Sequence, residues 1–254
     1  MAERLDGTVA LVTGASSGIG EAAARALAAQ GAAIALAARR KERLERLAAE
    51  ITRQGGRACV FETDVTEQPQ AQAAVDQTVA QLGRLDIVVN NAGVMLLGPI
   101  VGAPLEEWDR MVALNIRGLL YVAHAALPHL LQAAEDSPRR VADLVNISSV
   151  AGRMPRNGSG VYNLTKFGVG AFSESLRQEI TSRHVRVALV EPGAVKTELG
   201  SHLRPEIQAS QRQRFANLEL LEAEDIADAI TYIVTRPRRV AINELLIRPT
   251  EQEG

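Results

Sequence analysis

The sequence predicts an α/β protein built on one doubly wound parallel sheet. Short β-branched runs alternate with amphipathic segments along the chain, which is the pattern of right-handed βαβ units. Residues 87–89 and 187–190 are apolar throughout, as expected for strands that helices cover on both faces. The 254 residues, 46% of them hydrophobic, suffice for one large core. We therefore expect a single Rossmann-type domain over residues 1–254, with a seven-stranded sheet flanked by helices on both faces.

The elements follow one another in a regular order. A strand at 8–12 precedes a helix at 19–30, and a strand at 33–37 precedes a helix that ends near Gln54. Five further strands, separated by segments with helical spacing, are expected at residues 58–62, 86–90, 142–148, 185–191 and 244–248.

Two segments depart from this alternation. Residues 133–140 are polar and contain Asp136-Ser137-Pro138, so we expect a surface loop there. Residues 197–217 are rich in Arg, Gln and Ser and follow the carboxyl end of a strand, where such sheets bind ligands. We interpret them as a mobile substrate lid; the alternative is an ordinary pair of exposed helices.

Charge and composition favour a small-molecule partner. The net charge is −2 with no long run of either sign, which argues against nucleic-acid and membrane partners. No signal-peptide or membrane-length apolar stretch is recognised. Cys59 is the only cysteine, interpreted as a buried structural thiol of a cytoplasmic protein. No metal is expected, because no metal-ligand spacing relates Cys59 and the four histidines, His124, His129, His184 and His202.

A glycine-rich turn follows the first strand directly. Residues 13–20 read T-G-A-S-S-G-I-G, and such glycines allow backbone to approach a pyrophosphate at a helix N-terminus. A purely structural turn is the alternative, but the order of strand, turn and helix is that of a dinucleotide site. The turn residues expected to bind the cofactor are Gly14, Ser16, Ser17, Gly18, Ile19 and Gly20.

The end of the second strand indicates which dinucleotide binds. NAD-specific sites carry an acidic residue there, which accepts a hydrogen bond from the ribose 2′-hydroxyl. This chain has Ala38-Arg39-Arg40 instead, and guanidinium groups match a 2′-phosphate in charge and geometry. We expect NADP(H), with Arg39 as the main contact and Arg40 as the second. The alternative is that both arginines only begin a charged helix.

Tyr162 and Lys166 form a candidate acid–base pair. Hydride transfer to a carbonyl generates a developing alkoxide, which needs a proton from a general acid. Tyrosine, with a pKa of about 10, is weak at neutral pH unless a nearby ammonium lowers its pKa. Their spacing of four residues places both side chains on one helix face.

Further residues carry a family resemblance. Asn90-Asn91-Ala92-Gly93 follows the fourth strand, Ser149 precedes Tyr162 by 13 residues, and Pro192-Gly193 follows the sixth strand. With the glycine turn and the Tyr-x-x-x-Lys motif, the chain resembles the short-chain dehydrogenase/reductase family of the classical type over essentially its whole length. The resemblance implies an NADP-dependent oxidoreductase acting on CH–OH groups.

The resemblance also implies roles for individual residues. Ser149 would donate a hydrogen bond to the substrate oxygen; Ser148 competes for this role, but the family's spacing to Tyr162 selects Ser149. Asn115 would relay protons through water to Lys166, the alternative being a bond to helix carbonyls. Lys166 would reach the nicotinamide ribose.

Cofactor contacts beyond the turn are implied at the adenine, at the ribose and phosphates, and around the carboxamide. The alternative for Asp64 is a helix N-terminal cap. The contacts are, in that order, Asp64 and Val65; Asn91, Ala92 and Gly93; and Pro192, Gly193, Val195 and Thr197.

The expected substrate is a small polar aldehyde or ketone, or the corresponding alcohol, with a carboxylate as an optional feature. Aromatic residues make up only 3% of the chain, which argues against a large aromatic pocket. Arg153, Asn157 and His202 are candidate polar contacts, although Arg153 is alternatively an exposed loop residue. The candidate apolar wall is Met95, Leu96, Leu97 and Met154.

The same residues allow other functions to be compared with this one. A dehydrogenase of 3-hydroxy acids is the nearest alternative. A non-catalytic NADPH sensor has no need of Ser149, Tyr162 and Lys166 together, and sugar-nucleotide epimerases resemble longer chains. The apolar segments 105–132 and 159–183 predict a homotetramer with 222 symmetry, with the last strand near 245–247 at a second contact; the resemblance supports this.

Overall fold

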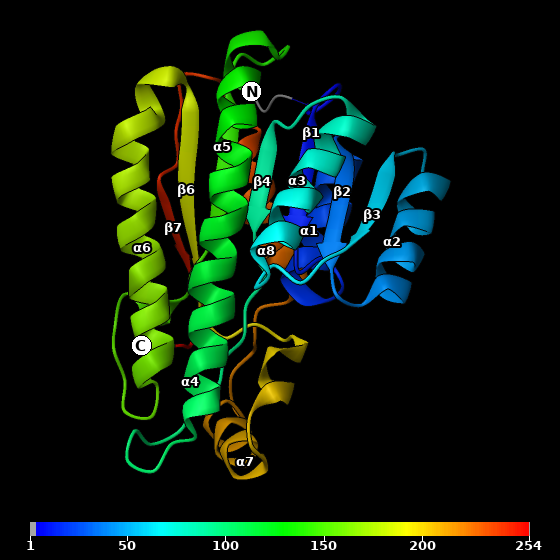
Figure 1. Ribbon diagram of the computed structural model, residues 1–254. Helices are drawn as coiled ribbons and strands as arrows, with labels where there is room; N and C mark the ends of the chain where they lie inside the picture. Colours follow the sequence, from blue (N-terminus) through cyan, green and yellow to red (C-terminus); the bar gives the residue numbers. More distant parts are fainter. Residues whose placement is uncertain (1–3, 254) are drawn as a thin grey trace.

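The structure is a computed structural model that describes residues 4–253, so residues 1–3 and 254 of the predicted domain lie outside it. It contains one seven-stranded parallel sheet of order β3-β2-β1-β4-β5-β6-β7 (Figure 1). The predicted fold class is confirmed. The strands are β1 (Val9–Thr13), β2 (Ala33–Ala38), β3 (Ala58–Glu62), β4 (Ile87–Asn90), β5 (Ala142–Ile147), β6 (Val185–Pro192) and β7 (Glu244–Ile247).

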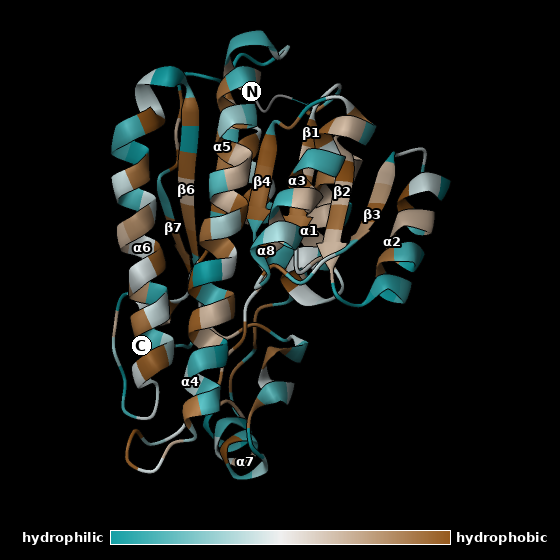
Figure 2. Cartoon of the chain, in the orientation of Figure 1, coloured by the Kyte–Doolittle hydropathy of each residue, from teal (hydrophilic) through white to brown (hydrophobic). Residues whose placement is uncertain are grey.

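Helices cover both faces of the sheet. One layer holds α1 (Gly18–Ala29), α2 (Lys41–Arg53) and α8 (Ala223–Val234); the other holds α3 (Gln68–Leu82), α5 (Leu119–Asp136) and α6 (Gly160–Ile180) (Figure 1). The strands are apolar on both faces because each face packs on a helix layer (Figure 2). In β1, Ala10 and Val12 belong to one core cluster and Leu11 to the other.

The surface loop expected at 133–140 is present only in part. Helix α5 continues to Asp136, residues 137–140 form a turn, and Arg139 within that turn is buried. The Arg139 guanidinium lies 3.2 Å from the carboxylate of Asp143, which also accepts from Arg186 at 2.7 Å. Burial of the Arg139 charge is tolerated because it has this partner.

The segment from Leu105 to Asp136 is longer and more apolar than the sequence pattern suggested. It comprises α4 (Leu105–Val112), a π-helical turn at Ala113–Gly118, and α5, and it has the length and hydropathy of a membrane span. Only 44% of its most apolar window is buried, but Val122, Ala126 and Leu130 pack into the core beneath the sheet. We interpret it as a core helix with an exposed apolar flank.

The strand order reverses beside β1, which lies between β2 and β4. Ligands of doubly wound sheets bind at such a switch point, outside the carboxyl ends of the strands. Beyond those ends lie a 3-10 turn at Glu198–His202 and helix α7 (Pro205–Arg214), which has no buried residue (Figure 1). The segment predicted as a lid thus contains helices, and its movement stays a prediction.

Candidate active site

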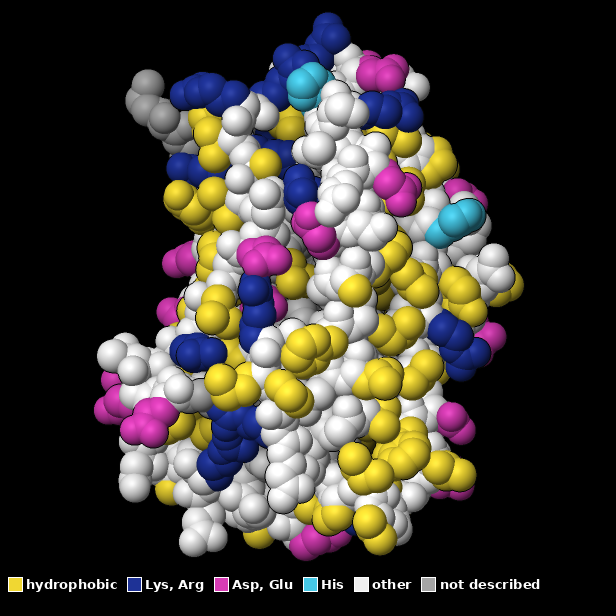
Figure 3. All heavy atoms as spheres, turned by 90° about the vertical axis from the view of Figure 1, so that its left-hand side faces the viewer, with side chains coloured by type: hydrophobic (Ala, Val, Ile, Leu, Met, Phe, Trp, Pro, Cys, Tyr) yellow, Lys and Arg dark blue, Asp and Glu magenta, His cyan; other side chains and the backbone are white. Residues whose placement is uncertain are grey.

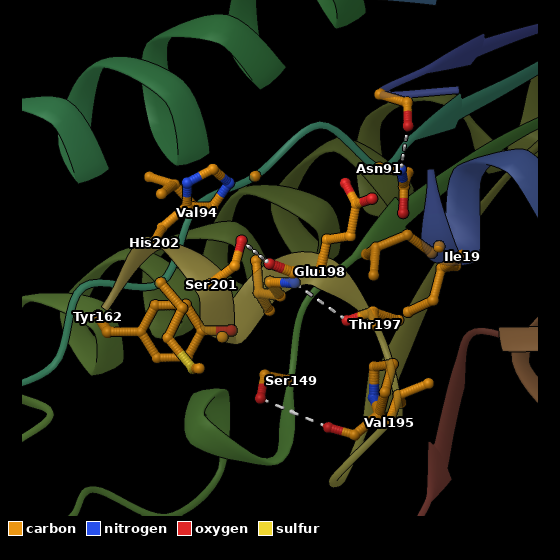
Figure 4. Close-up of a pocket in the computed structure, with 18 of the residues that line it drawn as sticks. Ile19, Asn91, Val94, Ser149, Tyr162, Val195, Thr197, Glu198, Ser201 and His202 are labelled. Atoms are coloured by element: carbon orange, nitrogen blue, oxygen red, sulfur yellow. Dashed lines mark hydrogen bonds between the residues drawn. The ribbon is translucent and has the colours of Figure 1, made fainter. Parts of the chain in front are cut away.

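One large cavity, with a volume of about 910 Å³, opens at the carboxyl ends of the strands. In Figure 4, Tyr162 and His202 lie on one side of it, and Ile19, Asn91 and Thr197 on the other. Of the candidate catalytic and cofactor-binding residues, only Gly20 and Asn115 do not line it. Those that do are Gly14, Ser16, Ser17, Gly18, Ile19, Arg39, Arg40, Asp64, Val65, Asn91, Ala92, Gly93, Ser149, Tyr162, Lys166, Pro192, Gly193, Val195 and Thr197.

The glycine turn is locked to the end of β4. The Asn91 side-chain amide donates to the carbonyl oxygen of Thr13 at 3.0 Å. Gly14 has a φ of +66°, where a side chain is strained, and a Cβ on Gly20 would lie 2.4 Å from Asn91 Nδ2. Gly20 therefore serves the packing of the turn against the strand, and its contact with the cofactor stays a prediction.

The two arginines at the end of β2 have different surroundings. The Arg40 guanidinium donates to Ser16 Oγ at 3.0 Å, to Ser17 Oγ at 2.6 Å and to a Glu198 carboxylate oxygen at 2.7 Å. Arg39 lines the cavity, and no described residue bonds its side chain. Arg39 is thus free to take an anion, whereas Arg40 already holds the turn and the segment after β6.

Asp64 closes a turn and does not cap a helix. One of its carboxylate oxygens accepts from the Thr66 backbone N–H at 3.0 Å and from the Thr66 hydroxyl at 2.7 Å. Helix α3 begins later, with Glu67 at its N-cap. The alternative interpretation of Asp64 is therefore wrong in detail, and the residue lines the cavity beside Val65.

Tyr162 and Lys166 project from the first turns of α6 and are both nearly buried. The Lys166 ammonium donates to the Ile147 carbonyl oxygen at 2.9 Å and lies 5.8 Å from the centre of the Tyr162 ring. The spacing of four residues thus brings the cation beside the ring, as the sequence predicts.

The protonation states of this pair follow from burial. Burial raises the pKa of Tyr162 to about 12, and a hydrogen bond with Ser149 offsets only part of the shift. Burial lowers the pKa of Lys166 to about 8. The pKa of Tyr162 is therefore raised and not, as expected, lowered by Lys166, because burial disfavours the phenolate and the ammonium alike. Tyr162 therefore holds its proton at neutral pH, which is the form that reduction requires.

The two adjacent serines have distinct positions. The Ser148 hydroxyl is buried and donates to the Lys166 carbonyl oxygen at 3.0 Å, so it is committed to α6. The Ser149 hydroxyl lies at the cavity and donates only a long bond of 3.4 Å to Pro192 (Figure 4). Ser149 Oγ also accepts from the Ala151 N–H at 3.1 Å, and its place at the cavity beside Tyr162 fits the choice of Ser149.

Asn115 lies in the π-helical turn and is buried. Its side-chain oxygen accepts from the Val94 N–H at 2.8 Å, and its amide donates to the Val94 carbonyl at 2.9 Å. The alternative of bonding to helix carbonyls is wrong: Asn115 fixes the segment after β4. A Cβ on Gly93 would lie 3.4 Å from Asn115 Oδ1 and 4.0 Å from Lys166 Nζ, so this glycine leaves the space between them open. The water relay stays a prediction.

Arg153 does not line the cavity, and its side chain forms ion pairs with two carboxylates. Its guanidinium donates to both carboxylate oxygens of the buried Glu191 at 2.8 Å and also pairs with Glu244. Arg153 is therefore the partner that makes a buried carboxylate at the end of β6 tolerable. The prediction of a substrate contact is wrong for this residue.

The predicted apolar wall is half present. Met95 and Leu97 line the cavity, whereas Leu96 is buried in the core cluster that also holds Tyr162 and does not line it. Met154 is exposed, and neither Met154 nor Asn157 is among the described residues that line the cavity; His202 is.

Sequence reasoning did not single out several residues of the cavity region. Arg156 and Glu198 both line it, and the Asn163 amide, next to Tyr162, holds the 151–156 turn by donating to the Ala151 carbonyl at 2.6 Å. The first two lie in irregular segments, where periodicity gives no orientation. Adjacency of Asn163 to Tyr162 was the one available signal.

Cysteine and metal chemistry play no visible part in the cavity. Cys59 is only half-buried on edge strand β3, so it is less enclosed than predicted. This partial burial raises the pKa of its thiol to about 11. Within residues 4–253, no group of three or more His, Cys, Asp or Glu side chains is placed to hold a metal ion.

Comparisons with known proteins agree with this site. A short chain dehydrogenase family model matches residues 8–208. An uncharacterized oxidoreductase of Staphylococcus epidermidis is 37% identical over 241 residues, covering 95% of this chain and 96% of the relative. A glycine betaine reductase of Emericella nidulans is 38% identical over 98% of this chain, which spans only 19% of that protein. The closed form of a serine dehydrogenase complexed with NADP+ has a TM-score of 0.88 and 32% identity, covering 97% of each chain.

The chain therefore belongs to the short-chain dehydrogenase/reductase family, and it is an oxidoreductase.

Proposed function

We propose that this protein is a cytoplasmic, NADPH-dependent reductase of small polar carbonyl compounds that carry an anionic group, with Tyr162 as the general acid. The observation that carries the proposal is one cavity that both Arg39 and Tyr162 line. A sensor that only binds the dinucleotide has no use for a buried, protonated tyrosine beside a lysine and a serine hydroxyl at the cavity.

The cavity fits NADP(H) in several respects. The Gly14–Gly20 turn packs so closely on residues 91–92 that Gly14 and Gly20 have no room for side chains, and such a glycine turn can hold a pyrophosphate. No carboxylate ends β2; Arg39 lines the cavity there and can pair with a 2′-phosphate. The similar serine dehydrogenase was solved with NADP+, which supports the same choice of cofactor.

The residues around the reacting end divide the chemistry among them. When bound, the reduced nicotinamide supplies a hydride to the carbonyl carbon. Tyr162 donates its hydroxyl proton to the carbonyl oxygen as negative charge develops there. Ser149 donates a hydrogen bond to the same oxygen and stabilises that charge. The ammonium of Lys166 then stabilises the phenolate until Tyr162 regains a proton.

Arg156 is the residue that selects an anionic substrate. Its backbone N–H donates to Asn163 Oδ1 at 3.3 Å, which ties it to the residue after Tyr162. Its side chain lines the cavity, and no described residue pairs with it. The acidic residues lining the described cavity are Asp64 and Glu198, and both have partners elsewhere. A carboxylate on the substrate would therefore meet an unopposed guanidinium near the reacting end.

The sequence offers independent support for this substrate class. Segments 93–99, 165–169 and 247–250 resemble those of clavulanate-9-aldehyde reductase, also called clavulanic acid dehydrogenase, and the chain also resembles dehydrogenases of 3-hydroxy acids. Both kinds of enzyme act on molecules that bear an acid group. Oxidation of a 3-hydroxy acid is the second candidate function, and the same Arg156 favours it.

Replacing Arg156 with glutamine should raise KM for acidic carbonyls by about tenfold or more, the cost of one charge-assisted hydrogen bond. KM for neutral carbonyls of similar size should stay nearly unchanged. Arg46→Gln, which removes the same charge from an exposed position on α2, is the control. Equal effects of Arg156→Gln on acidic and neutral substrates would remove Arg156 from substrate recognition.

We propose further that the protein is a homotetramer. Exposed apolar side chains lie on α6 and on the edge strand β7, with Leu164 62% and Leu246 46% exposed (Figure 3). Exposed apolar patches and open sheet edges are commonly covered by assembly. Light scattering at micromolar concentration should give the mass of four chains; a monomer mass would refute the assembly.

A further inference from the structure

Glu198 connects the segment after β6 to the start of α2. Its two carboxylate oxygens pair with Arg40 and Arg43, each at 2.7 Å. These pairs lower the pKa of Glu198 to about 2, so the carboxylate is charged at neutral pH. The partners are 158 and 155 residues away in sequence, so the contact is a tertiary bridge between two parts of the chain and not a local pairing.

The bridge lies where the adenosine end of the cofactor has to bind. Arg40 also donates to the hydroxyls of Ser16 and Ser17 in the glycine turn, and Arg39 and Glu198 line the same cavity. Two arginines, Arg40 and Arg43, thus hold one carboxylate, and Arg39 lines the same cavity. Since a guanidinium recognises carboxylate and phosphate by the same geometry, Glu198 occupies an anion site.

We infer that Glu198 determines cofactor affinity by competing with the 2′-phosphate of NADPH for Arg40. This inference rests on the proposed assignment of Arg39 and Arg40 to the 2′-phosphate. When the phosphate binds, Arg40 exchanges the carboxylate of Glu198 for a phosphate oxygen, and Glu198 keeps Arg43 or turns to solvent. The segment 198–202 is thereby released from α2, so occupancy of the phosphate site is coupled to the position of the predicted lid.

A different role would have a different signature. If Glu198 were a strap that closes over any bound dinucleotide, removing its charge would weaken NADPH and NADH alike. If Glu198 competes with the 2′-phosphate, removing its charge should instead strengthen binding, and only of ligands that carry the 2′-phosphate. The two roles can therefore be separated by ligands that differ only in that group.

The experiment measures binding by calorimetry with 2′,5′-ADP, which carries the 2′-phosphate, and with 5′-AMP, which lacks it. Glu198→Gln should bind 2′,5′-ADP about two- to fivefold more tightly than the parent, because an exposed ion pair no longer has to be broken. Binding of 5′-AMP should be unchanged. The control is Glu206→Gln, which removes a charge from α7 where Glu206 pairs only with Arg204 among described residues; it should alter neither.

Unchanged or weaker binding of 2′,5′-ADP to Glu198→Gln would overturn the competition. Arg40→Gln tests the underlying assignment separately. The Arg40→Gln variant should bind 2′,5′-ADP more weakly than the parent and bind 5′-AMP with unchanged affinity. If Arg40→Gln changes the affinity for neither ligand, the assignment of Arg40 to the 2′-phosphate fails, and the competition fails with it. If Arg40→Gln behaves as expected but Glu198→Gln does not bind 2′,5′-ADP more tightly, the cofactor assignment stands and only the competition is wrong.

Discussion

Replacing Tyr162 with phenylalanine should lower kcat by about a thousandfold, within the range for loss of a general acid. The affinity for NADPH should stay nearly the same, because the ring and its packing remain and only the hydroxyl is lost. Stopped-flow rates of NADPH oxidation and fluorescence titration of NADPH measure the two quantities separately.

The control for this variant is Tyr232→Phe, which removes a hydroxyl from a half-exposed tyrosine on α8. It should leave kcat unchanged. A near-normal kcat in Tyr162→Phe would show that the proton comes from another group, and the protonated state of Tyr162 in the free protein would then have no catalytic meaning.

The second large effect concerns cofactor choice. The double variant Ala38→Asp and Arg39→Leu should change the ratio of kcat/KM for NADPH over NADH by about a hundredfold in favour of NADH. It loses one charge-assisted phosphate contact and places a carboxylate where it can accept from a ribose 2′-hydroxyl. Ala38 and Arg39 both line the cavity, so both new side chains meet the cofactor.

Arg46→Leu, on the exposed side of α2, is the matched control and should leave the ratio unchanged. The expectation also requires that the parent enzyme prefers NADPH. Equal kcat/KM for both cofactors in the parent would contradict the assignment of Arg39 to a 2′-phosphate.

The fold could be predicted because local sequence patterns indicate the strands, the helices and their order. Each strand of the sheet is a short apolar run, and the glycine turn, Tyr162 and Lys166 lie at fixed positions relative to those runs. Residues at i and i+4 lie on the same face of a helix whatever the helix packs against. Such features place residues on a face without knowledge of the partners.

The failures at the site share one cause, which is that side-chain direction outside regular elements depends on tertiary partners. Arg153 and Arg156 both follow Ser149 in an irregular turn, yet one pairs with buried Glu191 and the other lines the cavity. Nothing local distinguishes them. Glu198 similarly finds its arginines across the cavity, through contacts that no spacing in the sequence encodes.

Transfer of deuterium from NADPH labelled at the reactive nicotinamide carbon tests the central claim most directly. The purified protein would be given small aldehydes, ketones and 3-oxo acids, and each alcohol product would be analysed by mass spectrometry beside the same reactions with Tyr162→Phe. The account predicts deuterium on the carbinol carbon, the highest kcat/KM for carbonyls bearing a carboxylate, and no labelled product from the variant. Labelled alcohol from bulky apolar ketones alone, or NADPH oxidation with no deuterium in any product, would contradict it.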